Sequence, residues 1–141
     1  MTERRILLDT GPLVALLSAE DSNHQACVAT LASLSPPLLT CWPVLTEAAW
    51  LLRKRAHAVD HLVAAFDAGL LTLLPLPQES LPWIARFMRR YQDSGAQLAD
   101  AAIVYLAEHE EIRTVFTLDR RDFSVYRLKR NRPFKIIPEV Q

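Results

Sequence analysis

The chain has few of the residues that build disulfide-stapled or turn-dense folds. Its 141 residues include only three glycines and two cysteines. Cys27 and Cys41 have no CxxC spacing, so we expect small buried side chains rather than a zinc site or a disulfide. The low glycine content and the 23% of charged residues argue against a turn-dense all-β fold and against disorder.

Long hydrophobic runs are also missing. No apolar run reaches the roughly 20 residues that span a bilayer, and the beginning of the chain, MTERRILLD, is too polar for a signal peptide. We therefore expect a cytoplasmic protein without a membrane segment. Half of the residues are hydrophobic, which is enough for the core of one domain over residues 1–141.

The chain does contain a regular alternation of short apolar strands and helices. Strands that are apolar throughout are typical of a parallel sheet covered on both faces, so the pattern predicts an α/β fold. The predicted strands cover residues 5–9, 38–41, 71–74, 114–118 and 134–137, and the predicted helices cover 12–19, 23–34, 44–55, 59–68, 79–91 and 98–109.

Four acidic residues interrupt or end apolar segments, where a charge is costly. Asp9 follows ILL, Glu47 lies within VLTEAAW, Asp100 lies within LADAAIVYLA, and Asp119 follows VFTL. Buried unpaired carboxylates are unfavourable, so four of them suggest a shared cation. Ligands of parallel sheets bind at the carboxyl ends of strands, where we place Asp9 and Asp119 as the first polar side chains after a strand. Glu47 and Asp100 can reach the same edge from helices.

Each acid also has a local explanation. A helix or turn cap, the dipole of a helix N-terminus, or a nearby cation would satisfy a single carboxylate. These roles would fall to Asp9, Asp119 and Asp122 as caps, to Asp100 at a helix start, and to Glu47 beside Arg53 or Lys54.

Basic residues are concentrated near the end of a chain whose net charge is zero. Half of the sixteen Lys and Arg residues lie between positions 113 and 135, against two acids in that stretch. A basic strip beside metal-binding acids suits a phosphodiester substrate, because it neutralises phosphates that the acids repel. A solvated surface is the alternative. The candidate nucleic-acid contacts are Arg120, Arg121, Arg127, Lys129 and Arg130.

The segments ILLDTGPLVALL, LTEAAWLLRK, LADAAIVYLAE and VFTLDRRDFSVYR follow one another between residue 4 and about residue 138. In this order they resemble the acidic motifs of PIN-domain ribonucleases, especially the small bacterial VapC-like toxins. The resemblance implies a three-layer PIN-like fold with about five mainly parallel strands between helices. It also implies that the chain is a metal-dependent endoribonuclease and the toxin of a toxin–antitoxin pair.

The resemblance assigns roles to individual residues. Asp9, Glu47, Asp100 and Asp119 match the metal-binding acids of the family, and Thr10 and Asp122 match supporting residues. Gly11 stands where serine is common, which removes one hydroxyl group. Carboxylate oxygens favour hard cations such as Mg²⁺ or Mn²⁺, so the acids themselves agree with this assignment.

We expect Asp9, Asp100 and Asp119 to hold one ion, and Glu47 to help bind a second ion or to orient the attacking water. Attack by water should leave a 5′-phosphate and a 3′-hydroxyl. Such an ion bound only by the native state should also raise the melting temperature.

Partners follow from the same resemblance. VapC-like proteins commonly form homodimers and are inhibited by a small antitoxin that covers the active-site groove. Apolar side chains that could anchor such contacts, or could instead pack in the core, are Leu13, Leu16, Leu17, Trp42, Trp50 and Trp83.

Two other functions are considered. The segment LLDTG also resembles retroviral-type aspartic peptidases, but those are strand-rich dimers, and a peptidase would leave Glu47, Asp100 and Asp119 unexplained. A PIN-like binding module without activity is the second alternative. His57 and His61 share a helix face at i, i+4 but lack the glutamate of a zinc motif, so we expect an exposed pair.

Overall fold

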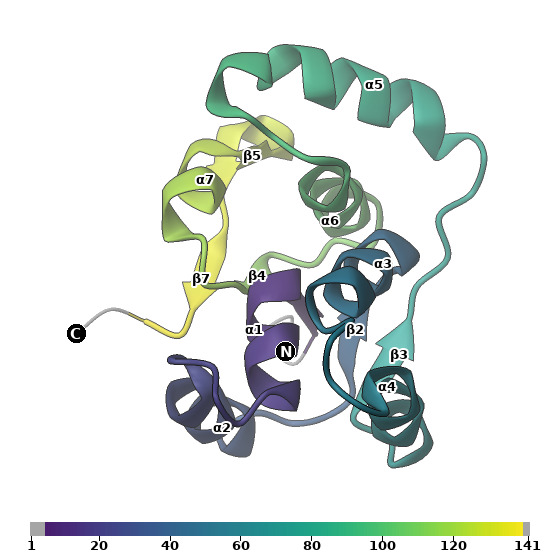
Figure 1. Cartoon of the computed structure of the whole chain (residues 1–141). Helices are drawn as coiled ribbons and strands as arrows, with labels where there is room; N and C mark the ends of the chain where they lie inside the picture. Colours follow the sequence, from purple (N-terminus) through teal and green to yellow (C-terminus); the bar gives the residue numbers. More distant parts are fainter. Residues whose placement is uncertain (1–4, 140–141) are drawn as a thin grey trace.

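The computed structural model describes residues 5–139, which form a five-stranded sheet with the strand order β3-β2-β1-β4-β7 (Figure 1). All four strand pairings are parallel. The side chains of β1, β2 and β4 are buried without exception, as expected of strands covered on both faces. The strands are β1 (Ile6–Leu8), β2 (Leu38–Thr40), β3 (Leu71–Leu73), β4 (Thr114–Phe116) and β7 (Lys135–Ile137).

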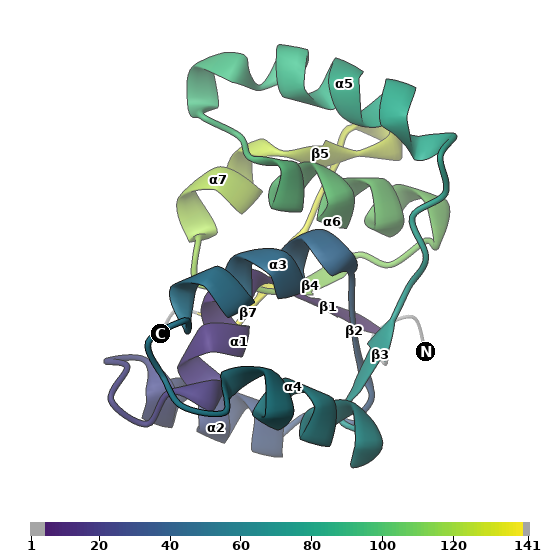
Figure 2. The same cartoon turned by 45° about the vertical axis from the view of Figure 1, so that its right-hand side comes forward.

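Helices cover both faces of this sheet. In Figures 1 and 2, α5, α6 and α7 lie above the sheet, and α1, α2 and α4 lie below it. The predicted α/β fold with three layers is therefore confirmed. The helices are α1 (Thr10–Leu17), α2 (His24–Ala32), α3 (Trp42–Leu51), α4 (Ala58–Asp67), α5 (Ser80–Arg90), α6 (Leu98–His109) and α7 (Arg120–Val125).

Helix α6 is the most buried helix of the molecule and packs against α5 and α3. It has the bounds that the sequence predicts. Four of its buried residues are alanines, whose small side chains allow the neighbouring elements to approach the helix closely. Phe116, Phe123 and Tyr126 are fully buried beside it, and burial of each such side chain contributes roughly 1.5–3 kcal/mol to folding.

Two helices begin two residues before their predicted starts, whereas the other predicted helix starts are correct to within one residue. Helix α1 begins at Thr10, two residues before the predicted start, and Pro12 fits in its first turn. Helix α3 covers Trp42–Leu51 rather than 44–55, because Pro43 is also tolerated in a first turn and the chain then turns toward α4.

Several short elements were not predicted. These are α7, the 3-10 turns η2 (Gln92–Ser94) and η3 (Lys129–Asn131), and an antiparallel hairpin of β5 (Arg127–Leu128) and β6 (Arg132–Pro133). Elements of two to six residues are too short to show a hydrophobic period, so only local capping and turn contacts define them. Within residues 5–139, none of the helices is long and apolar enough to cross a bilayer.

Candidate active site

The strand order reverses beside β1, and this reversal creates the candidate site. The chain passes from β1 to β2 and β3 on one side, then returns to β4 and β7 on the other. Such a switch point leaves a crevice at the carboxyl ends of the strands. A cavity of about 420 Å³ lies there, lined by Asp9, Thr10, Gly11, Glu47, Leu51, Gly95, Gln97, Asp100, Leu118, Asp119 and Asp122.

We call this cavity the acidic pocket. It brings together all four acids that interrupt apolar segments, together with both predicted supporting residues, Thr10 and Asp122. They come from the end of β1, from α3, from the first turn of α6 and from the segment after β4. Residues 110 positions apart in the chain therefore face the same space.

Asp9 is the most buried of these acids, with 7% of its surface exposed. Its backbone N–H donates to the carbonyl of Phe116 at 2.9 Å, which extends the pairing of β1 with β4. Its carboxylate accepts a hydrogen bond from the Thr117 hydroxyl at 2.7 Å. Burial raises the pKa of Asp9 to about 7, although the bond from Thr117 opposes this rise.

Thr117 joins two of the acids. Its hydroxyl donates to Asp9 and accepts a hydrogen bond from the backbone N–H of Asp119 at 3.0 Å. Thr117 is fully buried and directly follows β4, so it, and not Asp119, is the first polar residue after that strand. The expectation for Asp119 is corrected in this respect.

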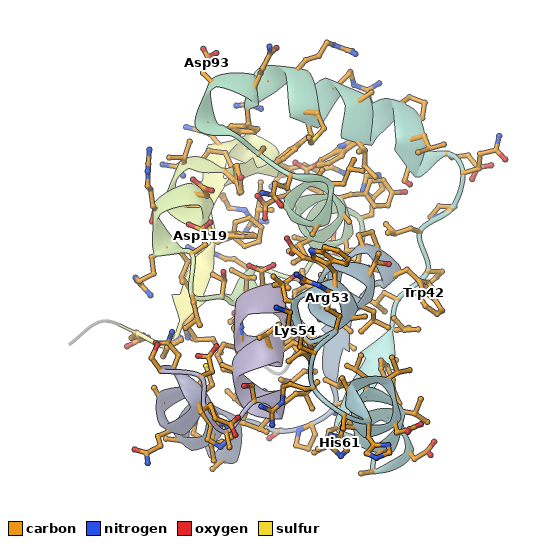
Figure 3. All side chains as sticks on the ribbon, viewed as in Figure 1. Trp42, Arg53, Lys54, His61, Asp93 and Asp119 are labelled. Atoms are coloured by element: carbon orange, nitrogen blue, oxygen red, sulfur yellow. The ribbon has the colours of Figure 1, made fainter. Side chains whose placement is uncertain are left out.

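Asp119 also has the local role of a cap. Its Oδ1 accepts a hydrogen bond from the backbone N–H of Asp122 at 3.1 Å and so begins α7. Figure 3 shows Asp119 at the base of α7, on the opposite side of the molecule from Trp42. Burial and the contact with Asp119 raise the pKa of Asp122.

Asp100 is held at the start of α6 by two hydrogen bonds to one of its oxygens. Oδ2 accepts from the backbone N–H of Gln97 at 3.3 Å, as part of a capping box, and from the Tyr126 hydroxyl at 2.8 Å. The helix-start explanation is thus confirmed, and the side chain lines the acidic pocket as well. Burial raises its pKa, and the charges of Asp119 and Asp122 contribute in the same direction.

Glu47 lies half-buried on α3. An ion pair with Arg53 or Lys54 was one explanation for this acid, and none is found among residues 5–139. Arg53 instead donates to the carbonyl of Trp50 at 2.8 Å and lies over its ring. The carboxylate of Glu47 therefore faces the acidic pocket without a cation beside it.

Thr117, Tyr126, Gln97 and Gly95 are the contributors that the sequence did not reveal. Thr117 is a polar residue inside an apolar run, and this pattern is the sequence signal that indicates it. Tyr126 looks like an ordinary core aromatic, because it lies 26 residues from Asp100 in the chain. Gly95 has φ +73°, a conformation that glycine adopts without strain, and it ends η2 at the edge of the pocket.

The predicted nucleic-acid contacts do not gather in one place. Arg120 and Arg121 begin α7 directly after Asp119, and Arg120 donates to the carbonyl of Pro138 at 2.7 Å. Arg127, Lys129 and Arg130 belong to the β5–β6 hairpin. None of the five lines the acidic pocket as it is defined by the described residues.

The predicted apolar anchors and the two histidines differ in how far their side chains are exposed to solvent. Trp42 and Trp50 are 66% and 64% exposed on α3, so they belong to the surface. Leu13 is buried in the core, Leu16 and Leu17 are half-buried, and the half-buried Trp83 donates to Glu108 at 3.2 Å. His57 pairs with Asp60 and His61 lies on α4, far from Asp119 in Figure 3, so the exposed pair is confirmed.

The donors of the acidic pocket fit a hydrated divalent cation. Five carboxylates line it, and mutual repulsion contributes to the raised pKa values of Asp9 and Asp100. The buried hydroxyl of Thr10 has no hydrogen-bond partner within residues 5–139, so it is available to bind a water molecule. In the same residues no three Asp, Glu, His or Cys side chains enclose an ion directly. Mg²⁺ retains several of its waters, so it does not require such a cage.

Known proteins share this sequence and fold. The profile of the PIN-domain family matches residues 6–129. The chain is 30% identical to Ribonuclease VapC26 of Mycobacterium tuberculosis over 135 residues, which cover 94% of this chain and all of that protein. Its fold matches the crystal structure of M. tuberculosis VapC20, a sarcin–ricin loop cleaving toxin, with a TM-score of 0.72 at 20% identity over 82% of this chain and 91% of the other.

The chain therefore belongs to the PIN-domain family, and within it to the VapC-type ribonucleases. The resemblance inferred from the acidic motifs is confirmed. The aspartic-peptidase alternative is not supported, since the parallel α/β sheet is not that of an aspartic peptidase, whereas a PIN-like binding module without activity would share this fold.

Proposed function

We propose that the acidic pocket hydrolyses RNA phosphodiester bonds with the help of a divalent cation, Mg²⁺ or Mn²⁺. The observation that carries this proposal is that, of the residues that the structure describes, five carboxylates and no Lys, Arg or His line one cavity at the switch point of the sheet. When bound, the cation would polarise a phosphoryl oxygen and lower the pKa of water. Membership of the VapC-type ribonucleases supports the reaction class.

The residues of the acidic pocket would have different roles in the reaction. Asp9, Asp100 and Asp119 would hold the cation, with Asp122 and the Thr10 hydroxyl binding its water molecules. Thr117 and Tyr126 would fix the orientation of Asp9 and Asp100 through the hydrogen bonds they donate. Glu47 forms no ion pair within the described part of the chain, so its carboxylate would be available to orient the attacking water and accept its proton.

The start of α7 would help to bind a phosphate group of the RNA beside the acidic pocket. Arg120 and Arg121 directly follow Asp119, so they are the cations nearest to the acids along the chain. There they would offset the repulsion between the acids and a phosphate. The reaction would leave a 5′-phosphate and a 3′-hydroxyl.

The proposed biological role is that of the toxin in a toxin–antitoxin pair, acting as a homodimer on cytoplasmic RNA. The exposed Trp42, Trp50 and Leu51 on α3 support a partner surface, and Leu51 also lines the acidic pocket. A small antitoxin bound there would cover the acids. Coexpression with a neighbouring small protein, followed by size measurement of the purified complex, tests this role; a monomer that no such protein inhibits would contradict it.

Cleavage of total RNA with mapping of the new ends tests the proposed reaction. We expect chelation, or any one of the substitutions Asp9→Asn, Glu47→Gln, Asp100→Asn and Asp119→Asn, to reduce cleavage about 100-fold or more. Asp93→Asn is the matched control, because Asp93 is exposed on the upper rim in Figure 3 and outside the acidic pocket. Unchanged cleavage in all four variants would place the reaction elsewhere.

A further inference from the structure

Seven basic residues line two neighbouring cavities that lie farther along α6, toward its C-terminal end, than the acidic pocket. The smaller cavity, about 290 Å³, lies between α5, α6 and β5, and the larger one, about 490 Å³, lies between the end of α6 and the β5–β6 hairpin. Glu108 lines both cavities, so they are adjacent. We call its basic residues the basic belt: Arg86, Arg90, Arg113, Arg127, Lys129, Arg130 and Arg132.

The basic belt carries more positive charge than the chain does on average. The net charge of the whole sequence is zero, yet only two acids from the described residues, Glu108 and Glu111, line these two cavities. Glu108 is engaged, because its Oε2 accepts the indole N–H of Trp83. A surface of this sign and density attracts a polyanion.

Part of the basic belt is held in place by the fold. The Arg127 guanidinium donates to the carbonyls of residues 124–126, and Arg113 donates to the carbonyl of Pro133 at 3.1 Å. Arg130 has a positive φ of 63° in the tight turn between β5 and β6, so that consecutive cations are displayed on the exposed tip. Cations fixed in this way lose less conformational freedom when they bind.

The basic belt is separate from the acidic pocket but lies within reach of the same substrate. The two surfaces share no lining residue. Asp100 and Glu108 lie on α6 eight residues apart, which is about 12 Å along the helix axis. A stacked strand rises about 3.4 Å per nucleotide, so an RNA that reaches from Asp100 to Glu108 extends about four nucleotides beyond the scissile bond.

We propose that the basic belt is a second RNA-binding site, which binds the phosphate backbone of extended or folded RNA while the acidic pocket cuts it. This inference rests on the proposed ribonuclease function. It makes the substrate a long RNA and not an oligonucleotide of a few residues.

Binding of RNA to the Asp9→Asn variant, which prevents cleavage during the measurement, tests the proposal. The probes are an RNA hairpin of about thirty nucleotides and an oligonucleotide of about four, chosen to span or not to span the two surfaces. In the Asp9→Asn variant, the double substitution R86Q/R132Q removes one exposed arginine from each cavity. The matched control is R89Q, an exposed arginine on the same helix that lines neither cavity, and R86K/R132K restores the charge.

We expect R86Q/R132Q to weaken hairpin binding about tenfold and to reduce the salt dependence by about two phosphate contacts. Binding of the short oligonucleotide should not distinguish R86Q/R132Q from R89Q. The charge-restoring variant should bind the hairpin normally. Equal loss of hairpin binding with R89Q, no loss with R86Q/R132Q, or equally tight binding of polyglutamate would overturn the proposal.

RNA cleavage by the unmodified chain is also measured, because it distinguishes failure of the second RNA-binding site from failure of the proposed ribonuclease function. If the chain cuts no RNA while R86Q/R132Q and R89Q still differ in binding, the ribonuclease proposal fails and the second site stands. If the chain cuts RNA and the two variants bind it equally, the second site is wrong and the ribonuclease proposal stands.

Discussion

The acidic pocket and the basic belt lie at opposite ends of α6 and are opposite in charge. Within residues 5–139, five acids and no base line the first, whereas seven bases and two acids line the second. The acids are buried or half-buried, apart from Asp119, and Asp9 and Asp100 are held by hydrogen bonds, while most of the bases are exposed. We therefore expect the acidic pocket to depend on the geometry of its carboxylates and on a bound cation, and the basic belt to depend on charge and ionic strength.

Thr117→Val should have the largest effect on the acidic pocket of the substitutions outside its acids. It removes the donor to Asp9 and the acceptor of the Asp119 N–H, so we expect a roughly 10- to 100-fold loss of divalent-ion affinity and of cleavage. RNA binding through the basic belt should be retained. Metal titration of cleavage and hairpin binding measure the two effects.

Thr40→Val is the control for this substitution. The buried Thr40 hydroxyl donates to the carbonyl of Leu8 at 3.1 Å and lies outside the acidic pocket. Its loss should reduce stability by about 1 kcal/mol with no change in ion affinity. Thr117→Ser should keep both hydrogen bonds; if it behaves like Thr117→Val, the hydroxyl is not the important group.

Tyr126→Phe should have a smaller effect on the same pocket. Without the bond from Tyr126, Asp100 keeps the backbone contact with Gln97, so we expect a loss of cleavage of about tenfold at limiting metal and less at saturating metal. Tyr91→Phe is the matched control, because the Tyr91 hydroxyl accepts the Arg127 N–H and does not contact Asp100. Equal effects of the two substitutions would indicate a general packing defect.

The smallest expected effect is a change of protein stability with pH, which arises from Asp9 in the acidic pocket. The pKa of Asp9 is raised from 3.8 to about 7, so the folded state binds its proton more tightly than the unfolded state does. This contribution to stability is complete below pH 3.8 and is lost as the pH rises through about 7. Without metal, the melting temperature should therefore fall over this range.

Divalent ions should reverse that fall, since they bind the ionised carboxylates of the native state. We expect Mg²⁺ or Mn²⁺ to raise the melting temperature by a few degrees more at pH 8 than at pH 5, compared with monovalent salt of equal ionic strength. Asp9→Asn should abolish the difference between the two pH values. A shift that persists in this variant would show that the ion stabilises the protein elsewhere.

The sequence alone determined the class of the fold and the acids of the site. Uniformly apolar strands alternating with helices require a sheet covered on both faces, and a carboxylate in an apolar segment is conspicuous wherever it occurs. Both signals are local, so Asp9, Glu47, Asp100 and Asp119 could be selected without a structure. Bounds were less accurate at α1 and α3, where proline is tolerated within a first turn.

Tertiary structure alone decided which side chains support those acids and where the bases lie. Tyr126 meets Asp100 because α7 folds back beside α6, and no property of Tyr126 itself indicates this contact. The bases between positions 113 and 135 look like one strip in the sequence, yet the hairpin carries three of the five predicted contacts away from the acids. Distances between such residues depend on how the elements pack, which the order of residues along the chain does not specify.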